Sequence, residues 1–227
     1  IEKFDSEPIA ALLLENLLDY CAFPAASAPE NRPGVLTVRD SAFARLLDRE
    51  LGIASMEDET LPRASGCVIA EGRAVTVERA RGLKQFVEAG GTLLISQTGP
   101  ECEEALRLLT GRTVHFVELP LPCDGFVPDE ITRGLAGFNV CYQQEWKNQD
   151  SPYARRRQTI RVPLCAGLEP LGGGGALARV RTGRGRIIFD QYPWPEYLTG
   201  GNRLRALNYI SILLTNLGVR LTDRYDW

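Results

Sequence analysis

A strand, a helix and a second strand follow one another between residues 66 and 96, and this succession constrains the fold more than any other feature. GCVIA at 66–70 is a short apolar run typical of a buried strand. VERARGLKQFVEAGG at 77–91 predicts a helix stopped by two glycines, and TLLIS at 92–96 predicts the next strand. Because a strand, a helix and a strand with so tight a stop are typical of parallel pairing, we expect an α/β fold.

A strand and a helix are also predicted upstream of this unit. GVLTV at 34–38 is a short run rich in β-branched residues, and FARLLDREL at 43–51 predicts a helix. Asp40 and Ser41 lie between them, and either side chain can cap the helix.

Downstream of it, Pro100 begins another predicted helix, and RTVHFVEL at 112–119 predicts a further strand. The helix dipole favours acids in the first turn, where the sequence places Glu101, Glu103 and Glu104.

From about residue 120 the pieces become shorter and are punctuated by Pro and Gly. ALARVRT at 176–182 and RIIFDQ at 186–191 predict a β-hairpin. The glycines at 172–175 predict a flexible loop, because they lack the strand-then-helix context of a phosphate-binding loop. The expected fold is thus a three-layer, doubly wound α/β domain with a mostly parallel sheet and a β-hairpin-rich addition after about residue 120.

Two similar helical segments lie near the two ends of the chain, at 8–23 and 204–219. Both have apolar residues at helical spacing. One interpretation is two ordinary amphipathic helices. The other is that residues 1–32, which end in the Pro/Ala/Ser-rich connector 24–32, are the tail of a preceding module and that 33–227 form the α/β domain. On that interpretation the chain is part of a longer polypeptide.

The charge balance argues against some classes of partner. The formal net charge is −3 and the pI is about 5.4, whereas a nucleic-acid binder needs a basic face. No apolar run approaches the length of a membrane span, and no signal peptide is visible. We therefore expect neither nucleic-acid nor membrane binding. Because the chain begins with Ile, processing would hide a signal, so the residues leave the cellular location open.

The cysteine and histidine pattern predicts neither a metal site nor a cofactor. The six cysteines form no CxxC pair, and His115 is the single histidine, whereas a zinc site draws on clustered ligands. The cysteines are consistent with buried thiols or with one or two disulfides, and the apolar strand favours a thiol for Cys67. The six are Cys21, Cys67, Cys102, Cys123, Cys141 and Cys165.

Three segments together resemble a known family: the run from Cys67 to Ser96, GRGRIIFDQ at 183–191 and NRLRALNYISILLTNLG at 202–218. They are similar to the class I glutamine amidotransferase-like (flavodoxin-like) domains that occur as accessory modules of large bacterial carbohydrate-active enzymes. The nearest family is the C-terminal region of family 2 glycoside hydrolases, the β-galactosidase-like ones. The resemblance covers roughly residues 33–220.

The resemblance implies a non-catalytic accessory or interaction domain whose parent polypeptide carries its catalytic acids on a separate barrel. Its partners would be other domains of that polypeptide or a second copy in a homo-oligomer, with carbohydrate as a further contact. It also implies an extracytoplasmic location.

Amidotransferases of this class use a Cys-His-Glu triad with the cysteine on a sharp strand-to-helix turn. In this chain Cys67 lies inside a predicted strand, and the strand at 92–96 ends in Gln97 rather than in a cysteine. Cys102 follows in the next helix, and His115 lies in mid-strand. We therefore expect no triad chemistry and assign no catalytic residue.

In open parallel sheets, ligands bind beyond the carboxyl ends of the strands. The turns there include DQYPWPEY at 190–197, where aromatic rings beside carboxylates and amides are typical of sugar binding. The alternative is that Tyr192 and Trp194 pack between the hairpin and the last helix. The candidate ligand or interface contacts at these turns are Gln97, Asp190, Gln191 and Trp194.

A second polar cluster, YQQEWKNQD at 142–150, adds Glu145 and Trp146 to the candidate contacts. A hydrolase centre there would need a second carboxyl group about 5–10 Å away. Asp150, Asp190 and Glu196 could supply that group. Two alternatives to the accessory domain therefore stay open: a stand-alone hydrolase that uses Glu145 with Asp190 or Glu196, and a small-ligand-binding module at the strand ends.

Overall fold

The structure is a computed structural model, and it describes residues 34–36, 41–53, 66–122, 125–141, 159–198, 201–219 and 221. All of them belong to one compact unit, Asn31–Trp227. The helix expected at 8–23, the connector at 24–32 and the cluster at 142–150 lie outside the described residues. The proposed seam between 1–32 and 33–227 therefore stays a prediction.

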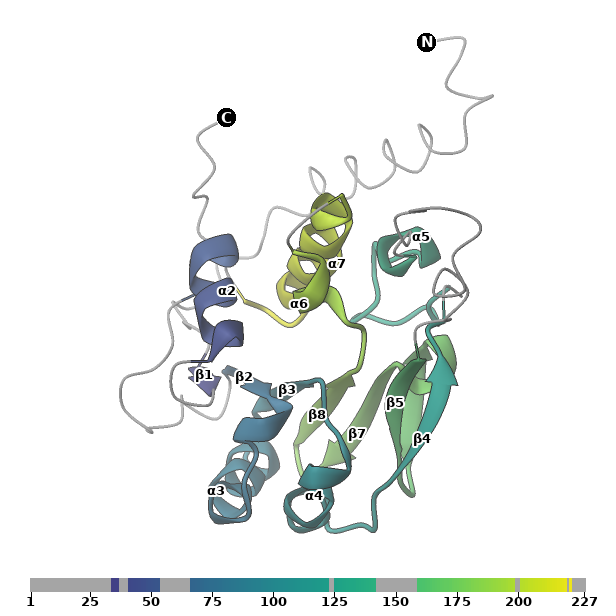
Figure 1. Ribbon diagram of the computed structural model, residues 1–227. Coiled ribbons are helices and arrows are strands. Elements are labelled where there is room, and N and C mark those ends of the chain that lie inside the picture. The colour runs from purple at the N-terminus through teal and green to yellow at the C-terminus, as the bar shows by residue number, and fades with distance from the viewer. Residues whose placement is uncertain are drawn as a thin grey trace, which may run out of the picture. The chain divides into compact units, whose positions relative to one another are not determined.

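A six-stranded sheet forms the centre of the described chain (Figure 1). Its first four strands in spatial order are parallel neighbours, and the last two continue it in antiparallel pairing. The order is β1 (Gly34–Leu36), β2 (Cys67–Glu71), β3 (Thr92–Ser96), β8 (Gly185–Asp190), β7 (Leu177–Thr182) and β6 (Leu168–Gly172). The expected α/β class with a mostly parallel sheet is confirmed.

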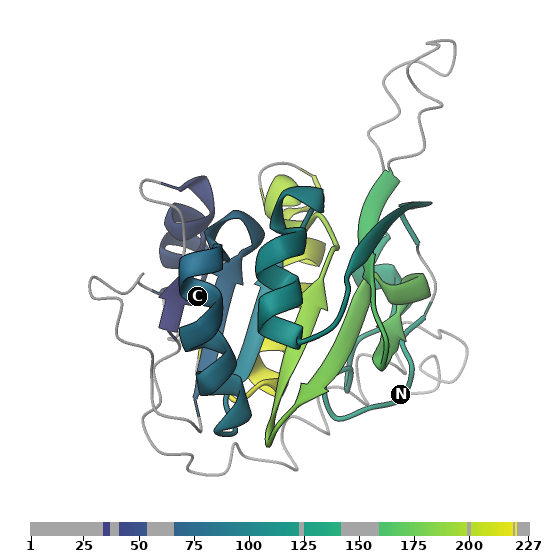
Figure 2. The same cartoon turned by 90° about the horizontal axis from the view of Figure 1, so that it is seen from below.

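Helices cover both faces of the sheet, which gives three layers (Figures 1 and 2). The helices α2 (Ala42–Leu51) and α7 (Arg203–Asn216) lie on one face. The helices α3 (Val77–Glu88) and α4 (Glu103–Thr110) lie on the other. None of the described helices is both long and apolar enough to cross a membrane.

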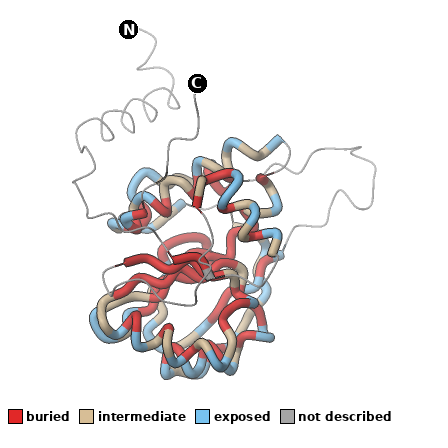
Figure 3. Tube along the Cα trace, turned by 90° about the vertical axis from the view of Figure 1, so that its left-hand side faces the viewer, coloured by how far each residue is buried: buried red, intermediate tan, exposed pale blue. Residues whose placement is uncertain are grey.

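Buried residues gather along the strands of the main sheet (Figure 3). The side chains of these strands divide between two apolar cores. In β3, Leu94 belongs to the core under α2 and α7, whereas Leu93 and Ile95 belong to the core under α3 and α4. All three are fully buried, which is why the strand reads as a continuous apolar run rather than an alternating one.

The helix boundaries follow from local chemistry. The Ser41 hydroxyl accepts a hydrogen bond from the Phe43 N–H at 3.0 Å, so of the two proposed caps it is Ser41 that begins α2. Thr76 caps α3 in the same way through the Arg79 N–H. Gly52, in the left-handed region at φ 67°, ends α2.

The predicted hairpin forms, but it is part of the main sheet. Its second strand, β8, pairs in parallel with β3, from Thr92 with Arg186 to Ser96 with Asp190. The strand expected near 112–119 instead leaves the main sheet. It forms β4 (His115–Pro120), which pairs antiparallel with β5 (Thr159–Leu164) in a second, two-stranded sheet.

The glycine run at 172–175 is ordered rather than a flexible loop. It forms the short helix η4 (Gly173–Gly175), in which Gly173 and Gly175 are buried. The next residue, Ala176, accepts a hydrogen bond from the Gln191 N–H at 2.7 Å, which ties this turn to the end of β8. The remaining short helices are η2 (Gly72–Ala74), η3 (Pro100–Cys102), α5 (Gly137–Val140) and α6 (Trp194–Tyr197).

Candidate functional site

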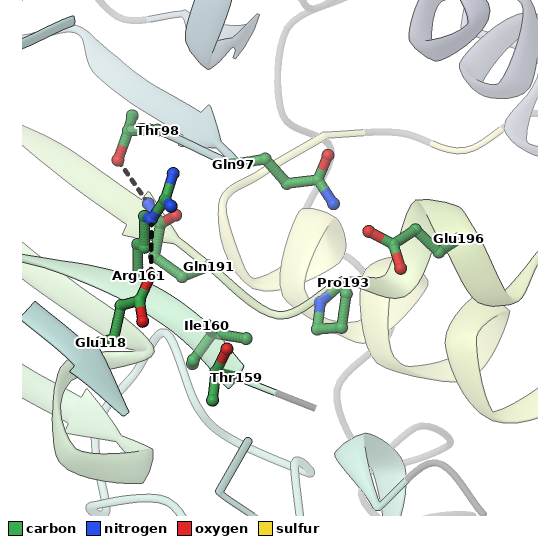
Figure 4. Close-up of a pocket in the computed structure, with 9 residues that line it drawn as sticks. All are labelled: Gln97, Thr98, Glu118, Thr159, Ile160, Arg161, Gln191, Pro193 and Glu196. Carbon is green, nitrogen blue, oxygen red and sulfur yellow. Dashed lines mark hydrogen bonds and ion pairs between the residues drawn. The ribbon is translucent and has the colours of Figure 1, made fainter. Parts of the chain in front are cut away.

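A pocket of about 330 Å³ lies beyond the carboxyl ends of β3 and β8, where the second sheet and α6 approach them (Figure 4). This is the edge at which open parallel sheets bind ligands. Most of the side chains around it are polar. They are Gln97, Thr98, Glu118, Thr159, Ile160, Arg161, Gln191, Pro193 and Glu196.

Gln97 occupies the sharp turn between β3 and η3. Its φ of 57° lies in the left-handed region, and it is the only non-glycine residue with positive φ among those the structure describes. Two neighbours hold it there. Its N–H donates to the Asp190 carbonyl at 2.9 Å, and Gly72 leaves room for its carbonyl, which a Cβ at position 72 would meet at 2.4 Å.

Gln191 forms the wall of the pocket at the end of β8. Its side chain is buried, and its Nε2 donates to the Thr98 hydroxyl at 2.6 Å. This hydrogen bond connects the turns that follow β3 and β8, so the two polar side chains are held in fixed positions (Figure 4).

The second sheet supplies the opposite wall. Glu118 of β4 and Arg161 of β5 face each other in register and form an ion pair at 3.1 Å, with both side chains more than half exposed. Thr159 and Ile160 continue this wall, and Pro193 and the exposed Glu196 complete the rim.

Asp190 lies in the core beside the pocket rather than in its lining. Its carboxyl group accepts hydrogen bonds from Trp194 Nε1 at 2.8 Å, from the Tyr209 hydroxyl at 2.9 Å and from the Tyr192 N–H at 3.2 Å. Burial raises the pKa of Asp190 to about 7, and the hydrogen bonds from Tyr209, Trp194 and Tyr192 oppose that rise. The carboxyl group thus joins β8 to α6 and α7.

The aromatic rings of this segment pack inside the protein. Trp194 and Tyr192 are both 0% exposed. Trp194 packs against Phe43 of α2 with ring centroids 5.6 Å apart, and Tyr192 packs edge-on against Tyr209 at 5.4 Å. Of the two interpretations of these rings, the geometry therefore agrees with packing, since no ring face is open for a sugar.

The predicted contacts thus separate into three groups. Gln97 and Gln191 line the pocket together, whereas Asp190 and Trp194 support it from the core. Glu145 and Trp146 lie outside the described residues.

The sequence analysis missed the wall made by Glu118, Thr159 and Arg161. The sequence does carry one signal for it, because polar and apolar residues alternate from Thr159 to Val162 in β5, as they do in a strand with one exposed face.

The two buried thiols among the described residues, Cys67 and Cys102, are poorly placed for nucleophilic catalysis. Cys67, Cys102, Cys141 and Cys165 are all free, and the thiol expected for Cys67 is confirmed. Burial raises the pKa of Cys67 to about 12, and burial also raises the pKa of Cys102, whose Sγ lies 3.2 Å from the Gly72 carbonyl. His115 is exposed on β4, in the second sheet.

No protein-family model matches this chain, and no curated protein matches it either. Among solved structures, the chain is similar to the exo-β-1,4-mannosidase Op5Man5 from Opitutaceae bacterium strain TAV5. The TM-score is 0.49 at 14% identity, over 92% of this chain and 38% of that one. A cold-adapted β-galactosidase from Rahnella sp. R3 gives a TM-score of 0.41 at 13% identity, over 92% of this chain and 34% of that one. The chain thus spans well under half the length of either enzyme.

Proposed function

We propose that this chain is a non-catalytic accessory domain of a larger carbohydrate-active enzyme, a glycoside hydrolase of the β-galactosidase-like kind. Its origin would be an amidotransferase-like α/β domain that no longer carries a catalytic triad. Its partners would be the other domains of the same polypeptide or a second copy of the chain. The segments at 67–96, 183–191 and 202–218, which resemble such domains, support the family part of this proposal.

The observation that carries the proposal is the identity of the residue on the β3 turn. A nucleophile elbow places a Ser or Cys on a strained turn between a strand and a helix, so that the reactive atom is exposed. Here the residue at φ 57° between β3 and η3 is Gln97. A carboxamide is neither a nucleophile nor a general base at neutral pH. The backbone geometry of an elbow is thus present without its chemistry.

The neighbouring thiols do not replace the missing nucleophile. The thiolate is the reacting form of cysteine, and burial raises the pKa of both Cys67 and Cys102. Neither thiol lines the pocket.

The carboxylates support the same conclusion. Asp190 is fully buried and accepts three hydrogen bonds from the protein, so it cannot reach a glycosidic bond in the pocket. Glu118 is ion-paired with Arg161. Glu196 would therefore need either Glu118 released from this ion pair or another acid to make the carboxyl pair that glycoside hydrolysis requires.

Two measurements test the proposal. The first is the length of the native polypeptide, which should be much greater than 227 residues and include a catalytic barrel. A native chain of only this length would contradict an accessory role. The second is turnover of aryl β-galactosides and aryl β-mannosides by the isolated chain, where we expect no hydrolysis above that of a buffer control.

Hydrolysis by the isolated chain would instead favour a stand-alone enzyme. Glu145→Gln and Glu196→Gln would then identify the acid, because removal of a catalytic carboxyl group lowers the rate by orders of magnitude. Glu103→Gln, in the first turn of α4, is a matched control outside the pocket lining.

A further inference from the structure

We propose that the pocket beyond β3 and β8 binds a small, uncharged, polyhydroxylated molecule, and that the carboxamide of Gln97 is its central hydrogen-bonding group. This inference goes beyond the accessory role. It would hold or fail whatever the parent polypeptide is, because it concerns only the pocket and the residues around it.

The first argument is that the left-handed backbone at position 97 is costly for a long side chain such as that of glutamine. At φ 57° a side chain is strained, whereas glycine adopts this region freely. Strained positions of this kind cluster at binding and catalytic sites, where the side chain is needed despite the strain.

Among the described residues, the side chain of Gln97 forms no hydrogen bond that would stabilise the fold. The hydrogen bond of this residue to Asp190 uses the backbone N–H, and its carboxamide forms no hydrogen bond with the described residues. The carboxamide instead points into the pocket toward Glu196 (Figure 4). A ligand is the partner that would account for a polar group held there.

The second argument is the mixture of donors and acceptors around the pocket. The two carboxamides of Gln97 and Gln191 each offer both an N–H donor and an oxygen acceptor. Gln191 uses its Nε2 on Thr98, and its Oε1 accepts no hydrogen bond from the described residues. Because a hydroxyl group donates and accepts at once, a ligand rich in hydroxyls matches this set.

The charges of the lining argue against an anion. The guanidinium of Arg161 is paired with Glu118, and Glu196 adds a further carboxylate. The described part of the lining therefore offers no unpaired cation to a phosphate or carboxylate group.

The volume of the pocket and its apolar lining narrow the class of expected ligand further. A volume of about 330 Å³ lies at the lower end of the roughly 300–1,000 Å³ of small-molecule sites. Among the described residues, no aromatic side chain lines this pocket, and Ile160 and Pro193 are its apolar members. A monosaccharide or an open-chain polyol held by its rim of hydroxyls fits better than a longer sugar chain stacked on rings.

The test is a titration of the ¹⁵N-labelled full chain, followed by NMR, with D-galactose, D-mannose and D-sorbitol. The two hexoses and the open-chain polyol distinguish a ring from a linear ligand. We expect at least one probe to shift the side-chain NH₂ signals of Gln97 and Gln191 in a saturable manner. Inorganic phosphate at the same concentrations should shift neither signal.

Gln97→Gly separates binding from folding. It removes the carboxamide and relieves the backbone strain, so we expect binding at least tenfold weaker with an unchanged or higher melting temperature. Gln85→Ala removes an exposed carboxamide on α3, away from the pocket, and should bind as the wild type does.

Three results would overturn the inference: no saturable shift with any of the three probes, binding by Gln97→Gly as tight as by the wild type, or an equal loss in Gln85→Ala. Should Gln97→Gly fail to fold, Gln97→Asn replaces it. Asn tolerates the left-handed region but is one methylene shorter, so it should also weaken binding, and unchanged affinity would contradict the proposal.

Discussion

Asp190 and Arg179 are both buried, but their surroundings are opposite in kind. The carboxyl group of Asp190 accepts hydrogen bonds from the neutral donors of Trp194, Tyr209 and Tyr192. Arg179 forms ion pairs with Glu169 at 2.6 Å and with Asp129 at 3.1 Å. Neutral donors stabilise a buried charge less completely than a counter-charge does, and the two sites differ in their response to pH for that reason.

The pKa directions express this difference. Burial dominates at Asp190 and raises its pKa to about 7. At Arg179 burial lowers the pKa, but hydrogen bonds and charges from Glu169 and Asp129 outweigh it, so the pKa is raised and the group stays cationic. One cluster therefore titrates near neutral pH, and the other keeps its charge.

The two clusters also hold different parts of the molecule. Asp190 connects β8 to α6 and α7 beside the pocket. Arg179 connects β7 to β6 through Glu169 and to the segment before α5 through Asp129.

The largest loss of stability is expected from Asp190→Ala. It leaves the Trp194 N–H and the Tyr209 hydroxyl buried without their acceptor, so we expect a loss of about 3–5 kcal/mol in the free energy of unfolding. Urea denaturation near pH 5, where the native carboxyl group is protonated, measures it. A loss below about 1 kcal/mol would show that the carboxyl group does not join these elements.

The pH dependence of stability should be a second effect of comparable size. The native pKa of Asp190, about 7, is above its ordinary value of 3.8, so its stabilising contribution is complete below about pH 4 and is lost as the pH rises to about 7. Within that window the loss is on the order of 1.4 kcal/mol per pH unit. Asp190→Asn cannot titrate and is the matched control. A difference between wild type and Asn variant that does not change from pH 4 to 8 would contradict the raised pKa.

Arg179→Met should lower the free energy of unfolding by less, about 1–2 kcal/mol at neutral pH. Methionine replaces much of the buried aliphatic part of the arginine side chain, and the carboxylates left behind can regain water because the side chains of Glu169 and Asp129 are 44% and 18% exposed.

The stability contributed by the ion pairs of Arg179 depends on pH with a sign opposite to that of Asp190. Hydrogen bonding to Arg179 lowers the pKa of Glu169, so this contribution is present at neutral pH and is lost on acidification below about 4.5. If Arg179→Met lowered the free energy of unfolding as much as Asp190→Ala does, the two clusters would not differ in their contribution to stability.

The smallest effect is expected from Arg181→Met. Arg181 also approaches Glu169, at 3.4 Å, but its side chain is 68% exposed. Exposed ion pairs contribute little, so the free energy of unfolding should change by less than about 0.5 kcal/mol. Urea unfolding curves of Arg179→Met and Arg181→Met, measured side by side, would then distinguish the effect of burial on stability from the effect of charge. A larger loss of stability in Arg181→Met would mean that exposed ion pairs contribute substantially to the stability of this region, contrary to the expectation.

The elements that the sequence predicts well are those whose signals are local. The run at 92–96 has an apolar centre, follows two glycines, and forms β3 at those residues. Ser41 and the glycines at 183 and 185 mark a helix start and a hairpin turn by their own chemistry.

The pairing of distant segments could not be predicted in this way. Nothing in residues 185–190 specifies β3 as the neighbour of β8, since that choice depends on the packing of both cores. The same limit applies to the candidate site. The rule that ligands bind at strand ends leads to Gln97 and Gln191, but Glu118 and Arg161 reach the pocket only through the second sheet.

The central place of β8 has a consequence for synthesis on the ribosome. Its partner β3 is made much earlier, since Arg186 bonds to Thr92 across 94 residues of sequence. At a usual rate of about 5–20 residues per second, the far edge of β3 waits roughly 5–20 s for its neighbour. During that time an apolar strand with unpaired backbone groups is open to other nascent chains. Slower translation before residue 185 would lengthen that interval and should increase aggregation.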